Sequence, residues 1–164
     1  MKLYIKQKVF SFKDKFYVKD ENGNDRYYIE GELFSFGKKL HIYDMNNNEL
    51  ALVQQKVLSF LPRYFVFTNG IQRAEIVKEF TLFRNKYRID GLGWEVDGNF
   101  MDHDYEITSH GRHLVSIKKE WFTWGDSYVL NIADTADEVI ALSVVLAIDC
   151  VIAHQRAAAS AANN

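Results

Sequence analysis

The feature that most constrains the fold of this chain is an apolar run at residues 139–153, VIALSVVLAIDCVIA. Only Ser143 and Asp149 interrupt it. A helix that is apolar on every side must be buried, either in protein or in lipid. The helix expected here is therefore a membrane span or the core of the protein.

The length and the flanks of the run favour the protein core. A transmembrane helix needs about 20 predominantly apolar residues, and a central Asp costs roughly 2.5–3.5 kcal/mol on the insertion scale. This run is shorter, carries Asp149 and has no flanking Trp or Tyr. Thr135 and Glu138 have the spacing of a capping box, and Asp137 suits the positive end of a helix dipole. We therefore predict a core helix that starts at this box, and no transmembrane span.

The residues before the helix have the period-two pattern of β-strands. In KLHIYD, residues 39–44, Leu40 and Ile42 share one face, while Lys39, His41 and Tyr43 share the other. Aromatic residues make up 15% of the chain and there is one proline, which favours uninterrupted strands. Four pairs predict tight turns: Asn22-Gly23, Asn69-Gly70, Asp97-Gly98 and His110-Gly111. We expect strands to fill residues 2–132.

Two internal echoes suggest two pseudo-repeats of about six strands each. YYIEGELFSFG at 27–37 is echoed at 87–98, and LVQQKVLSF at 52–60 is echoed at 114–122. Roughly twelve antiparallel strands would close to avoid free edges, and the resulting cylinder, roughly 24 Å across, would hold a helix about 10 Å wide. The predicted fold is mainly β: a closed, roughly twelve-stranded antiparallel barrel around a central hydrophobic C-terminal helix. It forms one domain over residues 1–156, with a low-complexity tail at 157–164.

Several sequence features together carry a family resemblance. They are Gly125-Asp126, YVLNI at 128–132, Asp137-Glu138, the late helical pair Ile148-Asp149, and the stretch from Tyr27 to Phe60. Their order resembles the LURP-one-related family over about residues 10–155. That family belongs with tubby C-terminal domains and phospholipid scramblases. The resemblance implies a tubby C-terminal-like barrel and a bacterial-type member.

The resemblance does not carry over the phosphoinositide site of tubby domains. In those domains a Lys-x-Arg pair on the outside of the barrel holds the phosphoinositide. Placing FGKKLHIYD, residues 36–44, on the tubby segment puts Glu30 and Glu32 where the pair should be. Because two carboxylates repel a phosphate, we do not expect that ligand at this place.

Other reactive side chains have structural interpretations. One predicted hairpin contains Asp102, His103, Asp104, His110 and His113. These residues lack the standard spacing of metal ligands, so we expect their side chains to be exposed and to bind no metal or cofactor. Cys150 and His154 stand one helical turn apart, but a Cys in a core helix is usually a small hydrophobe and not a nucleophile. Gly91-x-Gly93 is expected to form a bulge or turn rather than a phosphate loop. Asp149 must find a partner, lie at the barrel mouth or be protonated, which suggests a structural role.

Basic residues are the remaining candidates for binding. Arg84, Lys86 and Arg88 alternate in FRNKYRI and share one face of a predicted strand, and Lys38 with Lys39 follows a glycine. They are candidate ligands for an anion or a lipid headgroup, although outward strand faces are often basic without a ligand. Three such residues supply about 3 kcal/mol at an anionic surface, too little for stable anchoring without an apolar insertion. We expect any attraction to such a surface to be weak and salt-sensitive.

Charge and cysteine content complete the functional prediction. The net charge of −2 has no basic block, so nucleic acid is not indicated. The single Cys150 and the lack of an apolar signal region at the N-terminus favour a cytoplasmic location. The predicted function is a non-catalytic binding or scaffold module that contacts a ligand, lipid surface or protein through the barrel exterior. The alternative is a scramblase-like, lipid-translocating protein.

Overall fold

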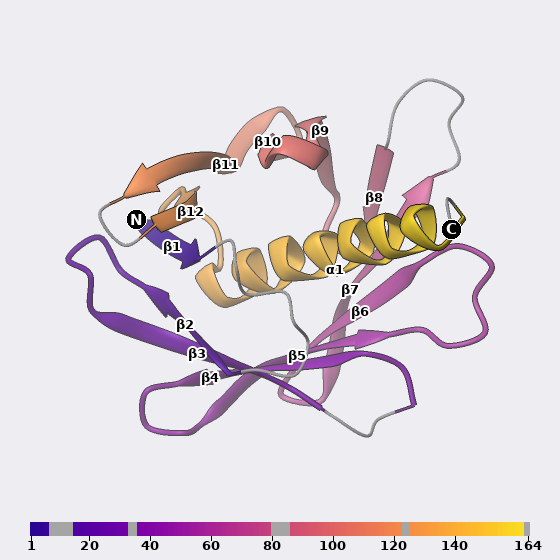
Figure 1. Cartoon of the computed structure of the whole chain (residues 1–164). Helices are drawn as coiled ribbons and strands as arrows, with labels where there is room; N and C mark the ends of the chain where they lie inside the picture. The colour runs from indigo at the N-terminus through magenta and orange to yellow at the C-terminus, as the bar shows by residue number, and fades with distance from the viewer. Residues whose placement is uncertain (7–14, 33–35, 80–85, 123–124, 163–164) are drawn as a thin grey trace.

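In the computed structural model, residues 1–6, 15–32, 36–79, 86–122 and 125–162 are described. Their strands form one closed barrel, and a long helix runs through it (Figure 1). The strands are β1 (Lys2–Lys6), β2 (Phe16–Lys19), β3 (Asp25–Gly31), β4 (Lys39–Asp44), β5 (Glu49–Gln55), β6 (Arg63–Thr68), β7 (Ile71–Glu79), β8 (Lys86–Asp90), β9 (Trp94–Asn99), β10 (Asp104–Ser109), β11 (Arg112–Phe122) and β12 (Gly125–Ile132). The helices are the 3-10 helix η2 (Phe100–Asp102) and the α-helix α1 (Glu138–Ala162).

Each strand pairs antiparallel with its neighbours in the chain, and β1 closes the barrel against β12. Leu3 lies opposite Leu130, and the main chains of Met1 and Ile132 exchange two hydrogen bonds of 2.8 and 3.0 Å. Closure pairs the edges that an open sheet would leave exposed. The predicted closed barrel of twelve antiparallel strands is confirmed.

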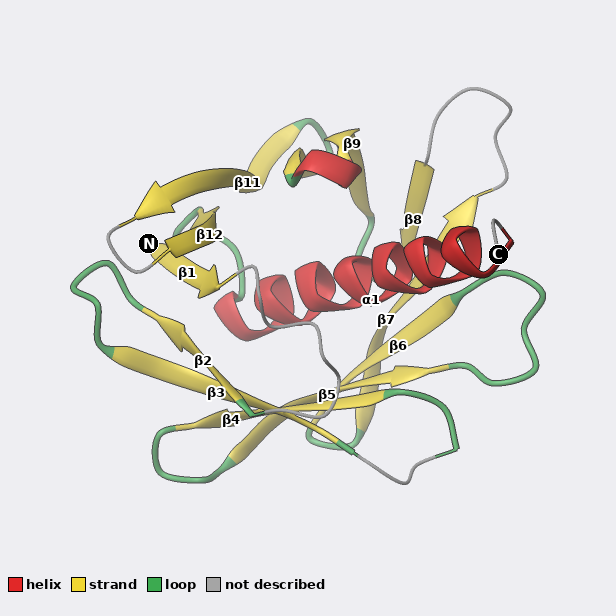
Figure 2. Cartoon of the chain, viewed as in Figure 1, coloured by secondary structure: helices red, strands yellow, loops and turns green. Residues whose placement is uncertain are grey.

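The core lies between the inner face of the strands and α1 (Figure 2). Leu40 and Ile42 of β4 are buried, as the period-two pattern predicts. On α1, every residue in Ile140–Ile152 is buried. The helix is long and apolar enough to cross a membrane, but 72% of its most apolar window is buried inside the protein. The central position predicted for the apolar run is confirmed.

The start of α1 differs in detail from the prediction. Oδ1 of Asp137 accepts a hydrogen bond of 3.0 Å from the main-chain N–H of Ile140, so Asp137 is the capping residue. Glu138 instead binds Arg26 of β3, with 2.6 Å between Oε1 and Nε. The predicted capping box at Thr135 is therefore wrong, although Asp137 does lie at the positive end of the helix. At its other end α1 continues through the predicted tail to Ala162.

The two ends of the barrel have different connections. At one, the turn end, lie the tight turns 20–24, 45–48, 69–70, 91–93 and 110–111, together with residues 133–137 before α1. At the other, the loop end, lie residues 36–38, 56–62 and 100–103, and α1 runs toward it (Figure 1). Asn69-Gly70 and His110-Gly111 have positive φ angles and join neighbouring strands, which confirms two of the predicted turns, and Asn22-Gly23 lies in a third.

The fourth predicted turn, Asp97-Gly98, is wrong because both residues lie within β9. Gly98 has a φ of 134°, and a Cβ there would lie 2.6 Å from the carbonyl oxygen of Asp104 on β10. The glycine thus permits close approach of two strands rather than a reversal of the chain.

The two pairs of similar sequence segments differ in how far apart they lie in the barrel. Residues 52–60 and 114–122 cover the end of β5 and most of β11, which are six strands apart and run in the same direction. Residues 27–37 and 87–98 begin on β3 and β8, five strands apart and opposite in direction. Only the first pair has the spacing that two six-stranded halves require.

Buried tyrosines predict a loss of stability at alkaline pH. Burial raises the pKa of Tyr27 and Tyr87 to about 12, and raises it further at three more positions. Those are Tyr64, Tyr105 and Tyr128. The unfolded chain releases these protons near pH 10, whereas the folded chain retains them. The free energy of unfolding therefore has its full value below pH 10 and falls above it, by roughly 1.4 kcal/mol per pH unit for each tyrosine.

Urea unfolding between about pH 9 and about pH 11 measures this slope. The variant Tyr87→Phe should lose stability more gradually with pH than the parent, because it carries one fewer buried phenol. A free energy of unfolding that stays constant across this interval would contradict the prediction.

Candidate functional site

Arg88 is the best-described member of the basic cluster predicted on β8. Its side chain points outward and binds two carboxylates, with Nε 2.7 Å from Asp90 and Nη1 3.4 Å from Glu79. Arg84 and the side chain of Lys86 lie outside the described residues. The positive charge of Arg88 is thus largely matched within the barrel wall.

Lys38 and Lys39 lie at the loop end, at the start of β4, and are separated from β8 by three strands. Nζ of Lys39 lies 3.0 Å from Glu32, whose other oxygen contacts His41. Lys38 is partly buried, and this burial lowers the pKa of its ammonium group. The described basic candidates therefore do not converge on one anion site.

Asp149 has two partners inside the barrel. Its carboxylate accepts a hydrogen bond from the hydroxyl of Tyr128 on β12, and Nε2 of His103 lies 3.1 Å from its other oxygen. The rings of His103 and Tyr128 stack with centroids 4.7 Å apart. Since a carboxylate only accepts, we assign the imidazole proton to Nε2. Of the three options for Asp149, the structure supports pairing.

His103 is a correction to the sequence interpretation. It follows η2 with a φ of 52° and is only 5% exposed, so it points into the barrel rather than into solvent. Its hairpin neighbours Asp102, Asp104, His110 and His113 are exposed, as predicted. No cluster of three or more metal-ligating side chains occurs among the described residues.

Cys150 and His154 do not form a nucleophilic pair in this geometry. Cys150 is fully buried, and burial raises the pKa of its thiol, which disfavours the reactive thiolate. His154 is exposed on the part of α1 that leaves the barrel. The environment of Cys150 is that of a small core residue.

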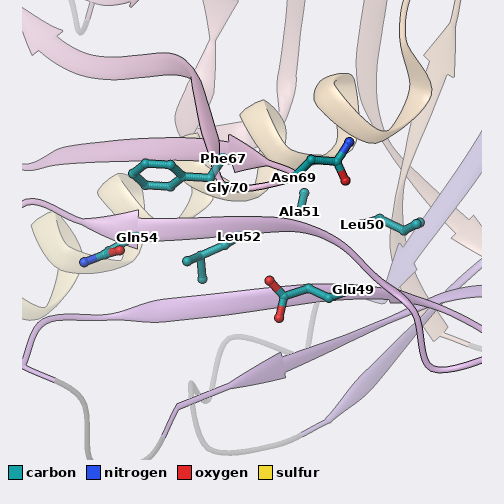
Figure 3. A pocket seen from close by; sticks show the side chains of 8 residues that line it. All are labelled: Glu49, Leu50, Ala51, Leu52, Gln54, Phe67, Asn69 and Gly70. Atoms are coloured by element: carbon teal, nitrogen blue, oxygen red, sulfur yellow. The ribbon is translucent and has the colours of Figure 1, made fainter.

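Two hollows on the described surface are small. One, of about 180 Å³, lies beside β5 and the β6–β7 turn, and Figure 3 shows Glu49, Leu52 and Phe67 among its lining side chains. Another, of about 250 Å³, lies between Tyr4 and Tyr17. Pockets for drug-sized ligands usually enclose about 300–1,000 Å³. These two hollows are below that range.

Exposed apolar side chains gather instead at the loop end. They project from the β3–β4 and β5–β6 connections, and we call them the loop-end patch: Phe36 (81% exposed), Val57 (39%), Leu58 (99%) and Phe60 (98%). The two connections lie against each other. A Cβ added to Gly37 would be only 2.8 Å from Cγ1 of Val57. The main-chain N–H of Gln55 also donates to the carbonyl of Lys38 at 2.8 Å.

Leu58 has an unusual backbone conformation as well as full exposure. Its φ of 59° lies in the left-handed region, where a bulky residue is strained and Asn or Gly is favoured. Within the described part of the chain, four other non-glycine residues have positive φ, and all are Asn or His. A non-glycine residue held in this region costs on the order of 1–3 kcal/mol, and such outliers cluster at functional sites.

Comparison with known proteins identifies the family and supports the fold. A family model described as LURP-one-related matches residues 1–149. The chain belongs to the LURP-one-related family. This LURP-one-related protein is 36% identical over 152 residues to the uncharacterized protein YxjI of Bacillus subtilis (strain 168), covering 93% of this chain and 94% of YxjI. The predicted bacterial-type membership is confirmed.

A solved structure supports the fold. The X-ray structure of a protein from Arabidopsis thaliana superposes with a TM-score of 0.64, covering 91% of this chain and 90% of that one. The two sequences are 14% identical, so this likeness concerns the fold alone. The same fold is therefore compatible with two widely different sequences.

The sequence interpretation missed both the loop-end patch and the burial of His103. A signal for the patch was present, because Val57, Leu58 and Phe60 stand between strands without the polar residues of the other turns. Its proximity to Phe36 depends on how the strands pair. No sequence signal separated His103 from the exposed residues around it.

Proposed function

We propose that the protein is a non-catalytic, cytoplasmic binding module of the LURP-one-related type, which contacts its partner through the loop end of the barrel exterior. Support comes chiefly from one contrast. The interior is filled by α1 and the hollows above are small, whereas the loop-end patch exposes two side chains almost completely. A large exposed apolar patch commonly marks an interaction site.

A photoreactive amino acid at Phe60 tests the binding surface in cells that express the full chain. We expect crosslinked products from position 60, seen as a shift on a denaturing gel for a protein partner or by mass spectrometry for a lipid. The matched control is Ile71, which is 61% exposed at the turn end. Equal products from both positions, or none from position 60, would argue against this surface.

A scramblase-like protein is the second candidate, because α1 satisfies the length and composition of a membrane span. This alternative requires α1 to leave the barrel, where Ile140–Ile152 are buried. Lipid movement between leaflets of vesicles reconstituted with the full chain would favour it over the binding module.

A further inference from the structure

We propose that the loop-end patch docks the barrel on an anionic lipid bilayer, with Leu58 and Phe60 inserted beside the acyl chains. This inference rests on the proposed function and names the partner of the same surface. The exposure of the patch, the charge around it and the backbone of Leu58 each support it.

The shape of the patch suits insertion into a soft medium. Leu58 and Phe60 lie in the β5–β6 connection and are 99% and 98% exposed, so they have almost no packing within the chain. A stable protein interface usually buries about 800 Å² on each partner. The patch consists of four side chains on two connections, whereas a few apolar side chains suffice to enter the boundary between headgroups and acyl chains.

Charge favours an anionic surface at this end. Four basic residues directly flank the patch in the chain: Lys38, Lys39, Lys56 and Arg63. Two carboxylates accompany them, since Glu32 binds Lys39 and Glu75 contacts both Lys56 and Arg63. The four basic residues outnumber these two carboxylates, and in the chain they stand close to the exposed tips, where headgroups would be.

The connections at the opposite end of the barrel, the turn end, are acidic. Its connections contain four carboxylates and no Lys or Arg: Asp20, Glu21, Asp134 and Asp137. The turn-end connections are thus acidic, whereas the residues that flank the loop-end patch in the chain are mostly basic. Near an anionic membrane this distribution orients the loop end toward the lipid.

The sequence VLSF of the β5–β6 connection has two counterparts elsewhere in the chain. VFSF at 9–12, LFSF at 33–36 and VLSF at 57–60 begin 24 residues apart, about the length of one hairpin of this barrel. Residues 9–12 and 33–35 lie outside the described part of the chain. The recurrence shows that an apolar pair followed by Ser-Phe is a repeated feature of the sequence rather than an isolated loop.

The backbone of Leu58 supplies the sharpest test. Because Asn adopts positive φ more readily than Leu, Leu58→Asn should raise the melting temperature of the isolated protein by roughly 2 °C while weakening binding to vesicles by about tenfold. If the role of Leu58 were purely structural, this substitution would lower the melting temperature of the protein. Opposite effects on stability and on binding would indicate that Leu58 is retained for contact with lipid.

The closing experiment uses the full chain and vesicles of phosphatidylcholine with roughly 30% phosphatidylserine. Co-sedimentation should show binding that decreases with salt but persists, because apolar insertion is not screened. Leu58→Ser combined with Phe60→Ser should lower the partition coefficient by about 100-fold. Ile71→Ser removes an exposed apolar side chain at the turn end and should leave binding unchanged.

A fluorescent probe reports insertion directly. Cys150 is the one cysteine and is buried, so an environment-sensitive dye on Ser59→Cys labels the patch without removing its apolar residues. Vesicles should shift its emission to the blue, and should leave a dye on Asn46→Cys, at the turn end, unchanged. Equal shifts at both positions, or parent-like binding by the double serine variant, would overturn the proposal.

The two proposals can fail separately. If position 60 still crosslinks to a protein in cells while the dye at position 59 remains solvated with vesicles, the lipid proposal is wrong and the binding module stands. If neither position gives a signal, both are wrong.

Discussion

A chain that ends at Asp134 is expected not to unfold cooperatively as a monomer. It keeps all twelve strands but loses α1, and with it eight fully buried or nearly buried aliphatic side chains of the core. At roughly 1.5–3 kcal/mol for each Leu, Ile or Val, they contribute about 12–24 kcal/mol, more than the 5–15 kcal/mol net stability of a typical domain. The inner faces of the strands would be exposed to water as well.

The matched control is a chain that ends at Arg156. It removes residues 157–164, of which the described residues 157–162 are exposed on α1, so its melting temperature should equal that of the full chain. Near-ultraviolet circular dichroism and thermal unfolding, measured with the oligomeric state, distinguish the two truncations. A cooperative monomeric transition in the shorter chain would show that the strands close without the helix.

Asp149→Leu is expected to lower the free energy of unfolding by about 3–5 kcal/mol. The substitution leaves Nε2 of His103 and the hydroxyl of Tyr128 buried without their acceptor, and an unsatisfied buried donor carries its full desolvation cost. Because all three groups lie inside the barrel, vesicle binding by the protein that remains folded should change little.

Tyr105→Phe is the control for Asp149→Leu. The hydroxyl of Tyr105 is buried and has no hydrogen-bond partner among the described residues, so its removal should be neutral or stabilising. Urea unfolding of both variants gives the comparison. Unchanged stability of Asp149→Leu with lost vesicle binding would instead assign Asp149 to a functional site.

The barrel and its core helix were predictable because each follows from a local pattern. Alternation at Leu40 and Ile42 identifies an inward face without reference to the rest of the chain, and the apolar run identifies the helix that fills the interior. The choice of Asp137 over Thr135 as helix cap was not predictable, because both are good caps and the pairing of Glu138 with Arg26 involves distant residues.

The candidate site was less predictable, because it depends on contacts between residues that are distant in the sequence. The sequence indicates that Asp149 requires a partner, but it does not indicate which of several histidines meets it. The charges of Arg88 and Lys39 are visible in the sequence, whereas the carboxylates that bind them come from neighbouring positions on paired strands. Contacts between distant segments thus decide which polar residues are available to a ligand.

Closure of the barrel by its first and last strands has a consequence for biosynthesis. Met1 and Ile132, which bond to each other, are 131 positions apart, and α1 is synthesised later still. A chain emerging from the ribosome therefore presents apolar strands before either their final pairing or their core helix exists. Folding must follow release of nearly the whole chain, and such non-local topologies fold slowly and aggregate readily. We expect the nascent protein to depend on chaperones more than its modest length suggests.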